Sequence, residues 1–379
     1  MPEIGTRIVS AESLPRRAER LLRDRAQTLS PHLVTIGLDG FVDEIVTVVD
    51  KRESVARFTR VPTIASLSRR IAGAAGKSSN IELVVDRTKL GGNGPIMANA
   101  MAAFGLQVNC IGSLGFPQVH PAFAELAARA TIYSVANPGL TEALEFEDGK
   151  VMLGKHQTLK EVNWNNLMER VGKERLVTLF SQSSLIALQS WTMLPLMSEI
   201  WEHMLAEICP KLAPGRSRIV FFDLADPEKR DIKDIRHALE LIGQFQNFFA
   251  AYLGLNEKES FEIGAALGYQ GRTEGEAAVK EVGQFILGKL KISGVVVHPR
   301  AYAAIAVSDG TALVPGPFAE KPLISTGAGD HFNAGFCLGK LMGADNEVAL
   351  QFGVAASGYY VRAAKSPSLI ELADFLHSL

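Results

Sequence analysis

The sequence predicts an α/β protein built on a doubly wound, mostly parallel sheet with helices on both faces and a small second β-sheet. Short apolar runs alternate along the chain with longer segments whose apolar residues recur at helical spacing, which is typical of parallel strands joined by helices. Two other regions alternate apolar and polar residues with the period of strands that face solvent. With 47% hydrophobic and 21% charged residues in a chain of 379, a sizeable core can be buried.

The N-terminal region predicts a helix that precedes the main domain. Apolar residues recur among charged ones between residues 13 and 29, which is the pattern of an amphipathic helix. We assign residues 1–30 to an N-terminal helical extension and residues 31–379 to the main domain. The first 30 residues lack the apolar stretch of a secretory signal, and no run approaches the roughly 20 apolar residues needed to cross a bilayer. We therefore expect a cytoplasmic protein without membrane contacts.

The main sheet begins with the apolar run at residues 33–37, which is closed by Gly and Asp. Further buried strands are expected at 108–111, 185–188, 219–222, 248–253 and 294–297. Helices are expected at 96–104, 122–130, 194–208, 231–245, 273–290, 330–342 and 346–361. The alternating stretches at about 41–50, 81–90 and 143–153 do not fit this scheme, and we interpret them as the strands of a small β lid over the main domain.

Charge and cysteine usage exclude several classes of protein. A formal net charge of −2 provides no broad basic field, so we expect no nucleic-acid partner. Cys110, Cys209 and Cys337 lie far apart and form no Cys-x-x-Cys pair, which argues against a disulfide framework or a structural zinc site. A reducing compartment fits this pattern best.

The most informative segment runs from Ser325 to Phe336, with Thr326, Gly327, Ala328, Gly329 and Asp330 at its start. Small residues leave backbone N–H groups accessible, and a helix beginning at Asp330 would add its positive dipole end, so the turn can hold a transferring phosphoryl group. Asp330 is placed to accept a proton from an attacking hydroxyl. Asn333, one helical turn later, can orient substrate or phosphate. A glycine-rich turn with Asp330 as helix N-cap is the structural alternative.

A second motif, Asn256-x-x-Glu259, follows an apolar run and so lies at the end of an expected strand. The oxygens of Asn256 and Glu259 share one face of a starting helix, where they can hold a hydrated Mg²⁺ through its water molecules. A capping box has nearly the same spelling, so this alternative stays open. His298 closes another apolar run and can either contact the nucleotide or serve a structural role.

The third motif is Gly91-Gly92-Asn93, directly before an apolar helix. Adjacent glycines allow a ligand to approach the backbone closely, although a plain tight turn would have the same sequence. Upstream, Asp39 and Asp43 follow the first strand, where a carboxylate can accept hydrogen bonds from polyol hydroxyls. We take Asp43 as the substrate-binding residue and expect Asp39 to be the less important of the two.

The order of these motifs resembles the ribokinase-like (PfkB) carbohydrate kinase family, over roughly residues 33–379. The resemblance implies that Gly327, Ala328 and Gly329 form an anion hole with Asp330 as catalytic base. It also implies that Asn256 and Glu259 organise Mg²⁺ and phosphates, and that Asp43 and the Gly91-Gly92 pair bind the substrate under a β lid.

Several positions depart from the family pattern. Ile324-Ser325 replaces an expected Asp-Thr pair, which puts a monovalent-cation site in doubt, and Ile96 stands where a substrate-binding Asn is usual. Gly115-Phe116-Pro117 replaces a Gly-Asp-Asp turn. The run from Gly91 to Asn99, with Val297-His298, is also similar to the ADP-dependent sugar kinase branch, so ADP remains a second donor to test.

We therefore predict a kinase that transfers the γ-phosphoryl group of Mg-ATP to a hydroxyl of a sugar or sugar-like substrate. A nucleoside, vitamin or phosphosugar kinase shares the same chemistry. A non-catalytic nucleotide- or sugar-binding regulatory protein is the alternative of another class, although such a protein has little need of Asp330. Exposed edges of the lid strands make a homodimer a reasonable expectation.

Overall fold

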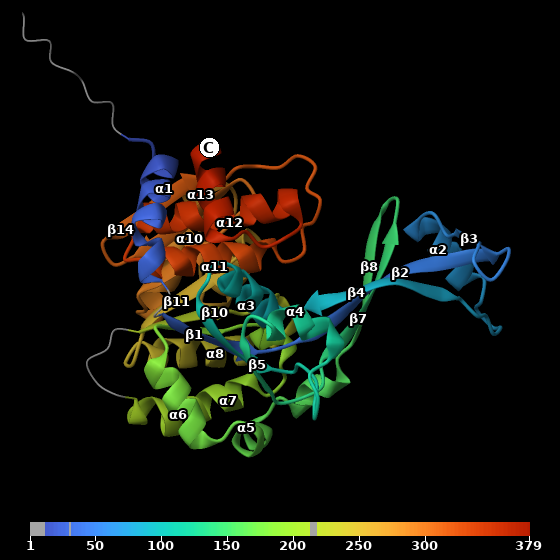
Figure 1. Ribbon diagram of the computed structural model, residues 1–379, viewed down its shortest axis with the longest axis horizontal. Helices are drawn as coiled ribbons and strands as arrows, with labels where there is room; N and C mark the ends of the chain where they lie inside the picture. The colour runs from blue at the N-terminus through green and yellow to red at the C-terminus, as the bar shows by residue number, and fades with distance from the viewer. Residues whose placement is uncertain (1–11, 30–31, 213–217) are drawn as a thin grey trace, which may run out of the picture.

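The computed structural model describes residues 12–29, 32–212 and 218–379, and contains a large sheet, a smaller sheet and flanking helices (Figure 1). The large sheet has nine strands in the order β14-β13-β12-β11-β10-β9-β1-β5-β6. Every pairing from β6 to β12 is parallel, whereas β13 and β14 add an antiparallel hairpin. Their bounds are β1 Leu33–Leu38, β5 Gln107–Gly112, β6 Thr131–Ser134, β9 Leu185–Leu188, β10 Ile219–Asp223, β11 Ala250–Leu255, β12 Gly294–Val297, β13 Tyr302–Val307 and β14 Gly310–Pro315.

Helices cover both faces of this sheet, which confirms the doubly wound fold. Alternate side chains of β9 enter different cores: Ile186 and Leu188 join one, while Leu185 and Ala187 join the other. One face is covered by α1 Leu14–Arg25, α3 Asn93–Ala103, α4 Ala124–Ala127, α11 Ala328–Leu341, α12 Asn346–Ala363 and α13 Leu369–Ser378. The other is covered by α5 Trp164–Arg170, α6 Lys173–Gln182, α7 Met197–His203, α8 Ile232–Phe245, α9 Glu257–Ala266 and α10 Gly275–Leu290. Short helical turns lie at Ala26–Thr28, Pro121–Phe123, Gln157–Glu161, Trp191–Met193, Met204–Ile208, Cys209–Lys211 and Pro227–Lys229.

The smaller sheet has five strands and projects from the main body (Figure 1). It consists of β2 Phe41–Arg52, β3 Phe58–Arg60, β4 Leu83–Gly91, β7 Gly139–Phe146 and β8 Gly149–Lys155, with α2 Ile64–Ala72 packed on it. Its strands leave the main body at one row of the sheet, where Phe41 pairs with Gly91 on one side and Gly139 on the other. A side chain at Gly139 would clash with the Phe41 ring, which lies 2.8 Å from the ideal Cβ position.

The structure corrects several sequence-based boundaries. The stretch at 143–153 is a hairpin of two strands that begins at Gly139, and β2 is mostly buried, because its apolar residues join the cores around it. The helix expected from Asp330 begins at Ala328, so Asp330 lies inside the first turn. The helix expected at 194–208 ends as an α-helix at His203, and the strand expected at 248–253 lies at Ala250–Leu255.

The N-terminal helix α1 packs against the main body through Ala18 and Leu22, both of them buried. Residues 1–11 and 30 of the expected extension lie outside the described residues. Over the ranges that the structure describes, no helix is both long and apolar enough to cross a membrane.

Candidate active site

The candidate site residues, most of them predicted from the sequence, gather where the parallel strands of the large sheet end. Asp39 follows β1, Asp223 is the last residue of β10, Asn256 follows β11 and His298 follows β12. The first turn of α11 lies at the same edge, since Asp330 is close enough to the carboxylates of Asp39 and Asp223 for their charges to raise its pKa. In open α/β sheets this edge is where ligands bind.

The Gly327–Asp330 turn has the geometry of an anion site. Gly327 caps α11 with φ 91°, a conformation that suits glycine. The N–H of Ala328 donates to the Ser325 carbonyl at 3.2 Å, so this amide is engaged within the turn. No backbone carbonyl in the described part of the chain accepts the N–H of Gly329 or Asp330. We therefore narrow the expected anion hole to the last two amides and the helix dipole behind them.

A clamp of three side chains, His331, Tyr360 and Ser366, holds this turn. The imidazole Nδ1 of His331 donates to the Gly327 carbonyl at 2.7 Å, and its Nε2 lies 2.9 Å from the Ser366 hydroxyl. The Tyr360 hydroxyl donates to the Thr326 carbonyl at 3.0 Å, and its ring stacks on His331 with centroids 3.6 Å apart. Burial lowers the pKa of His331 to about 4, so the ring is neutral near pH 7. None of these four contacts was foreseen from the sequence.

Asp330 is buried, and its Oδ1 has no hydrogen-bond partner in the described structure. Burial raises the pKa of Asp330 well above its usual value, and the charges of Asp223 and Asp39 raise it further. A hydrogen bond from the Asn93 side chain acts in the opposite direction. An unpartnered buried carboxyl is costly for folding, which is the pattern expected where a group serves a ligand or a reaction.

Asp39 and Asp43 have different roles in the fold. Asp39 is fully buried, and its two carboxylate oxygens accept the N–H groups of Asn93 at 2.9 Å and Gly94 at 2.8 Å, so it caps α3. Asp39 therefore has a structural role at the start of α3, and the expectation that Asp43 rather than Asp39 binds the substrate stays a prediction. Asp43 is 6% exposed, and burial raises its pKa. A Cβ at Gly91 would lie 2.7 Å from the Asp43 carboxylate, which explains why glycine occupies this position.

Asn256 and Glu259 form the capping box that was left open as an alternative. The Asn256 Oδ1 accepts the Glu259 N–H at 2.9 Å, and the Glu259 Oε2 accepts the Asn256 N–H at 2.8 Å. The second oxygen of Glu259 accepts the N–H of Asp226 at 2.9 Å. Burial raises the pKa of Glu259, which is 5% exposed. Capping thus consumes much of the hydrogen-bonding capacity of this motif.

Asp223 is a site residue that the sequence reasoning missed. Its Oδ2 accepts the Asn333 amide at 2.7 Å, while the Asn333 Oδ1 stays buried without a partner. Burial, followed by the Glu259 charge, raises the pKa of Asp223 to about 8. Buried carboxylates that repel each other suit a divalent cation, although among the described residues no three acidic, His or Cys side chains already converge as a metal cage. The sequence did contain a signal for Asp223, namely a carboxylate at the end of an apolar run, and the same signal had identified Asp39.

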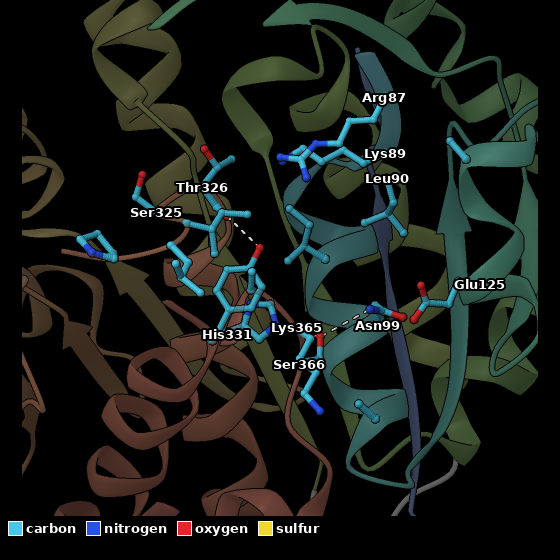
Figure 2. A pocket seen from close by; sticks show the side chains of 18 of the residues that line it. Arg87, Lys89, Leu90, Asn99, Glu125, Ser325, Thr326, His331, Lys365 and Ser366 are labelled. Atoms are coloured by element: carbon cyan, nitrogen blue, oxygen red, sulfur yellow. Dashed lines mark hydrogen bonds between the residues drawn. The ribbon is translucent and has the colours of Figure 1, made fainter. Parts of the chain in front are cut away.

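Two cavities lie on either side of the Ser325–Gly329 segment. The smaller, about 270 Å³, is lined by Asn256 and Gly329 and by a largely apolar set of residues that includes His298, Tyr302 and Phe318. Burial lowers the pKa of His298 to about 4, and its ring packs 4.7 Å from the Phe332 ring. The larger cavity, about 1040 Å³, lies between β4, α3 and the segments 322–326 and 364–368 (Figure 2). Ile96 lines it, at the position where the sequence departs from the family pattern.

Comparison with known proteins identifies the family. A model of the prokaryotic ketohexokinase family matches residues 13–379. The chain belongs to the prokaryotic ketohexokinase family. A ketohexokinase from Haloferax volcanii is 26% identical over 366 residues, which cover 96% of each chain.

Solved structures support the same fold for this ketohexokinase family member. Phosphofructokinase-2 from Escherichia coli aligns with a TM-score of 0.64 at 17% identity, over 92% of this chain and 99% of that one. Ribokinase from Arabidopsis thaliana, solved with ribose and ATP, aligns with a TM-score of 0.63 at 15% identity over the same shares. The predictions of a ribokinase-like fold and of a carbohydrate kinase, a phosphotransferase with an alcohol acceptor, are confirmed.

Proposed function

We propose that this sugar kinase phosphorylates a hydroxyl of a ketohexose, with ATP as donor and Asp330 as catalytic base. The observation that carries the proposal is the buried Asp330 carboxyl, whose Oδ1 is unpartnered beside the Gly329 and Asp330 N–H groups, which no backbone carbonyl of the described residues accepts. A base and an anion site in the same turn are what in-line phosphoryl transfer to a hydroxyl requires. The ketohexose follows from the family and from the Haloferax volcanii relative.

In the proposed reaction the sugar lies between Asp43, the Gly91-Gly92-Asn93 turn and Asp330. Asp330 accepts the proton of the hydroxyl as its oxygen attacks the γ-phosphorus, and the bond to the β-phosphate oxygen breaks. The amides of Gly329 and Asp330 stabilise the charge on the transferring group. The raised pKa makes Asp330 a stronger base, while the hydrogen bond from Asn93 favours its charged form.

The nucleotide is assigned to the smaller cavity, with its base against His298, Tyr302 and Phe318 and its phosphates toward Gly329. Thr326 and Asn333 border the phosphates in this arrangement. Bound Mg²⁺ would neutralise phosphate charge, and Asp223 and Glu259, with Asn256, are the residues suited to hold it through water. The smaller sheet acts as the lid. A homodimer through its edge strand β8, whose Met152 and Leu153 are exposed, and a cytoplasmic location stay predictions.

The decisive experiment is the Asp330→Asn variant, assayed on a panel of ketohexoses, aldoses, nucleosides, vitamins and sugar phosphates with ATP or ADP. We expect the wild type to turn over a ketohexose with ATP. Loss of the base should lower kcat by about 10²–10⁴-fold while nucleotide affinity stays within a few-fold. Asp309→Asn, which changes an exposed carboxylate in the turn between β13 and β14, serves as the control.

Turnover by Asp330→Asn within a few-fold of wild type would make Asp330 a structural residue. Preference for another acceptor class or for ADP would replace the corresponding part of the proposal. Binding without any turnover of the panel by the wild type would favour the regulatory protein instead.

A further inference from the structure

The larger cavity extends well beyond the residues assigned to the reaction. Its wall follows α3 from Ile96 to Ala103, a distance of about 10 Å at the rise of an α-helix. Neither Asp43 nor Asp330 lines this cavity, but Lys89 and Tyr360 do. The Asp43 charge affects the pKa of both Lys89 and Tyr360, and the Asp330 charge affects that of Tyr360, so both carboxylates lie near the cavity. The cavity therefore adjoins the proposed sugar site and continues past it.

The charges that line this cavity do not balance. The carboxylates are Glu125, Glu145 and Glu371, and the cations are Arg87, Lys89, Arg129, Lys150 and Lys365. Each carboxylate already pairs with one cation: Glu125 with Arg129 at 2.7 Å, Glu145 with Lys150 at 3.3 Å, and Glu371 with Lys365 at 2.5 Å. Within the described residues, Arg87 and Lys89 form no ion pair within 4.0 Å. Two positive charges are left for a ligand.

The surroundings of Lys89 disfavour its charged form as long as no anion is bound. Burial lowers the pKa of Lys89, and the neighbouring charges of Lys150 and Arg87 lower it further. The charges of Asp43, its cross-strand neighbour, and of Glu145 raise the pKa, but neither carboxylate forms an ion pair with Lys89. A half-buried ammonium that lacks an ion-pair partner is stabilised when an anion binds beside it.

The geometry favours a phosphate with a hydroxylated body. Arg87 and Lys89 are two residues apart, so both side chains leave the same face of β4, and they point into the cavity toward Ser325 and Thr326 on the opposite wall (Figure 2). Deeper in the cavity the Asn99 amide donates weakly to the Ser366 hydroxyl at 3.4 Å, while its Oδ1 is buried without a partner. Cations and hydroxyls suit a phosphate, and the free Asn99 Oδ1 needs a hydroxyl donor.

We propose that this cavity binds a phosphate monoester of a polyol. Its phosphate lies between Arg87, Lys89 and the Ser325–Thr326 hydroxyls, and a ligand hydroxyl donates to the Asn99 Oδ1. This site shares Ser325 with the nucleotide cavity, and Thr326 with the residues proposed to border the nucleotide phosphates, but it does not depend on the proposed reaction. A ligand held there joins the smaller sheet to the main body, so it should stabilise the closed arrangement of the two.

The test is binding of fructose 1-phosphate, inorganic phosphate and fructose to the full chain without nucleotide, measured by titration calorimetry at constant ionic strength. We expect fructose 1-phosphate to bind more tightly than either of the others. Arg87→Gln and Lys89→Gln should each weaken it about tenfold or more, since each removes a charge-assisted hydrogen bond. Asn99→Ala should weaken fructose 1-phosphate but leave inorganic phosphate unchanged. Arg57→Gln, an exposed position on the smaller sheet outside the cavity, is the matched control.

Three outcomes would overturn the proposal. The first is the absence of fructose 1-phosphate binding. The second is binding that Arg87→Gln and Lys89→Gln leave unchanged while Asp330→Asn alters it, which would place the phosphate in the α11 turn. The third is equal affinity for inorganic phosphate, which would exclude recognition of the polyol. Because binding is measured without nucleotide, the result does not depend on whether a variant keeps its kinase activity.

Discussion

Asp39 and Asp43 are chemically identical residues whose replacement should have different consequences. Asp39→Ala removes the acceptor for two N–H groups at the start of α3, and unsatisfied buried donors cost about 1–3 kcal/mol each. It should therefore lower the melting temperature. Asp43→Ala leaves the α3 cap intact and should instead reduce kcat/KM for the sugar, because the substrate hydroxyls lose a charged partner. Thermal unfolding and steady-state kinetics of both variants test this contrast.

Two further measurements serve as controls for these two variants. Nucleotide affinity should be unchanged in Asp43→Ala, and Asp39→Asn should recover part of the lost stability because one amide oxygen still accepts. A wild-type melting temperature for Asp39→Ala would contradict the capping role, and wild-type kcat/KM for Asp43→Ala would remove it from the substrate site.

Asp223 and Glu259 predict a stability that depends on pH and on Mg²⁺. Burial raises the pKa of Asp223 from 3.8 to about 8, so the folded state prefers the protonated form, and stability falls as pH rises through this range. A cation that binds the ionised carboxylates reverses the effect. Without Mg²⁺ the melting temperature should fall between pH 6 and pH 8, and Mg²⁺ should raise it more at pH 8.

The variants Asp223→Asn and Glu259→Gln separate this effect from general ion effects. Both should weaken the response of the melting temperature to Mg²⁺ and raise the Mg²⁺ concentration needed for half-maximal kinase rate. Glu228→Gln, an exposed carboxylate nearby, should change neither quantity. An unchanged Mg²⁺ response in both site variants would restrict Asn256 and Glu259 to capping.

At the scale of single elements, the packing of helix α1 on the main body can be tested directly. Leu22 is 1% exposed and packs into the core beneath α12 and α13. Arg17 and Arg23 form ion pairs with Asp345 at 2.5 Å and Asp374 at 2.9 Å. Leu22→Ala should lower the free energy of unfolding by about 2–5 kcal/mol, because it leaves a cavity. Denaturant unfolding measures this, and limited proteolysis shows whether α1 detaches.

The charges of α1 should contribute little by comparison. Arg23 hydrogen bonds hold the pKa of the Glu19 carboxyl down to about 2, so any contribution is lost as pH falls from 4.5 toward 2. Arg20→Gln, on the exposed side of the helix, should leave stability unchanged. Equal stability of Leu22→Ala and wild type would show that α1 does not belong to the folded core.

Elements with continuous apolar runs were predictable and others were not. β9 and β12 were placed at their observed bounds, because strands buried on both faces have unbroken apolar runs. The β13–β14 hairpin was missed, although Asp309-Gly310 at its turn is a recognised hairpin signal. The start of α11 was placed two residues late, because Gly327 and not Asp330 caps the helix.

At the scale of the whole molecule, the sequence predicted the sheet architecture and the gathering of Asp330, Asn256 and the glycine-rich turn. It could not predict the clamp on the anion site, because His331, Tyr360 and Ser366 meet only once α11 and α12 pack together. Asp223 was missed as a site residue for a related reason, because its hydrogen-bond partner Asn333 lies 110 residues away in the chain. Motifs carry local chemistry, whereas these contacts depend on packing.

The row of Phe41, Gly91 and Gly139 also determines how the two sheets can move relative to each other. Four strands connect the smaller sheet to the main body; three of them, β2, β4 and β7, meet in this row, two of them at glycine, and the fourth, β8, ends beside it at Lys155. Glycine at two of these crossing points gives the backbone there more conformational freedom than other residues would. Arg87, Lys89 and Asp43 all lie in the smaller sheet, so we expect any change in the angle between the two sheets to move them together relative to Asp330.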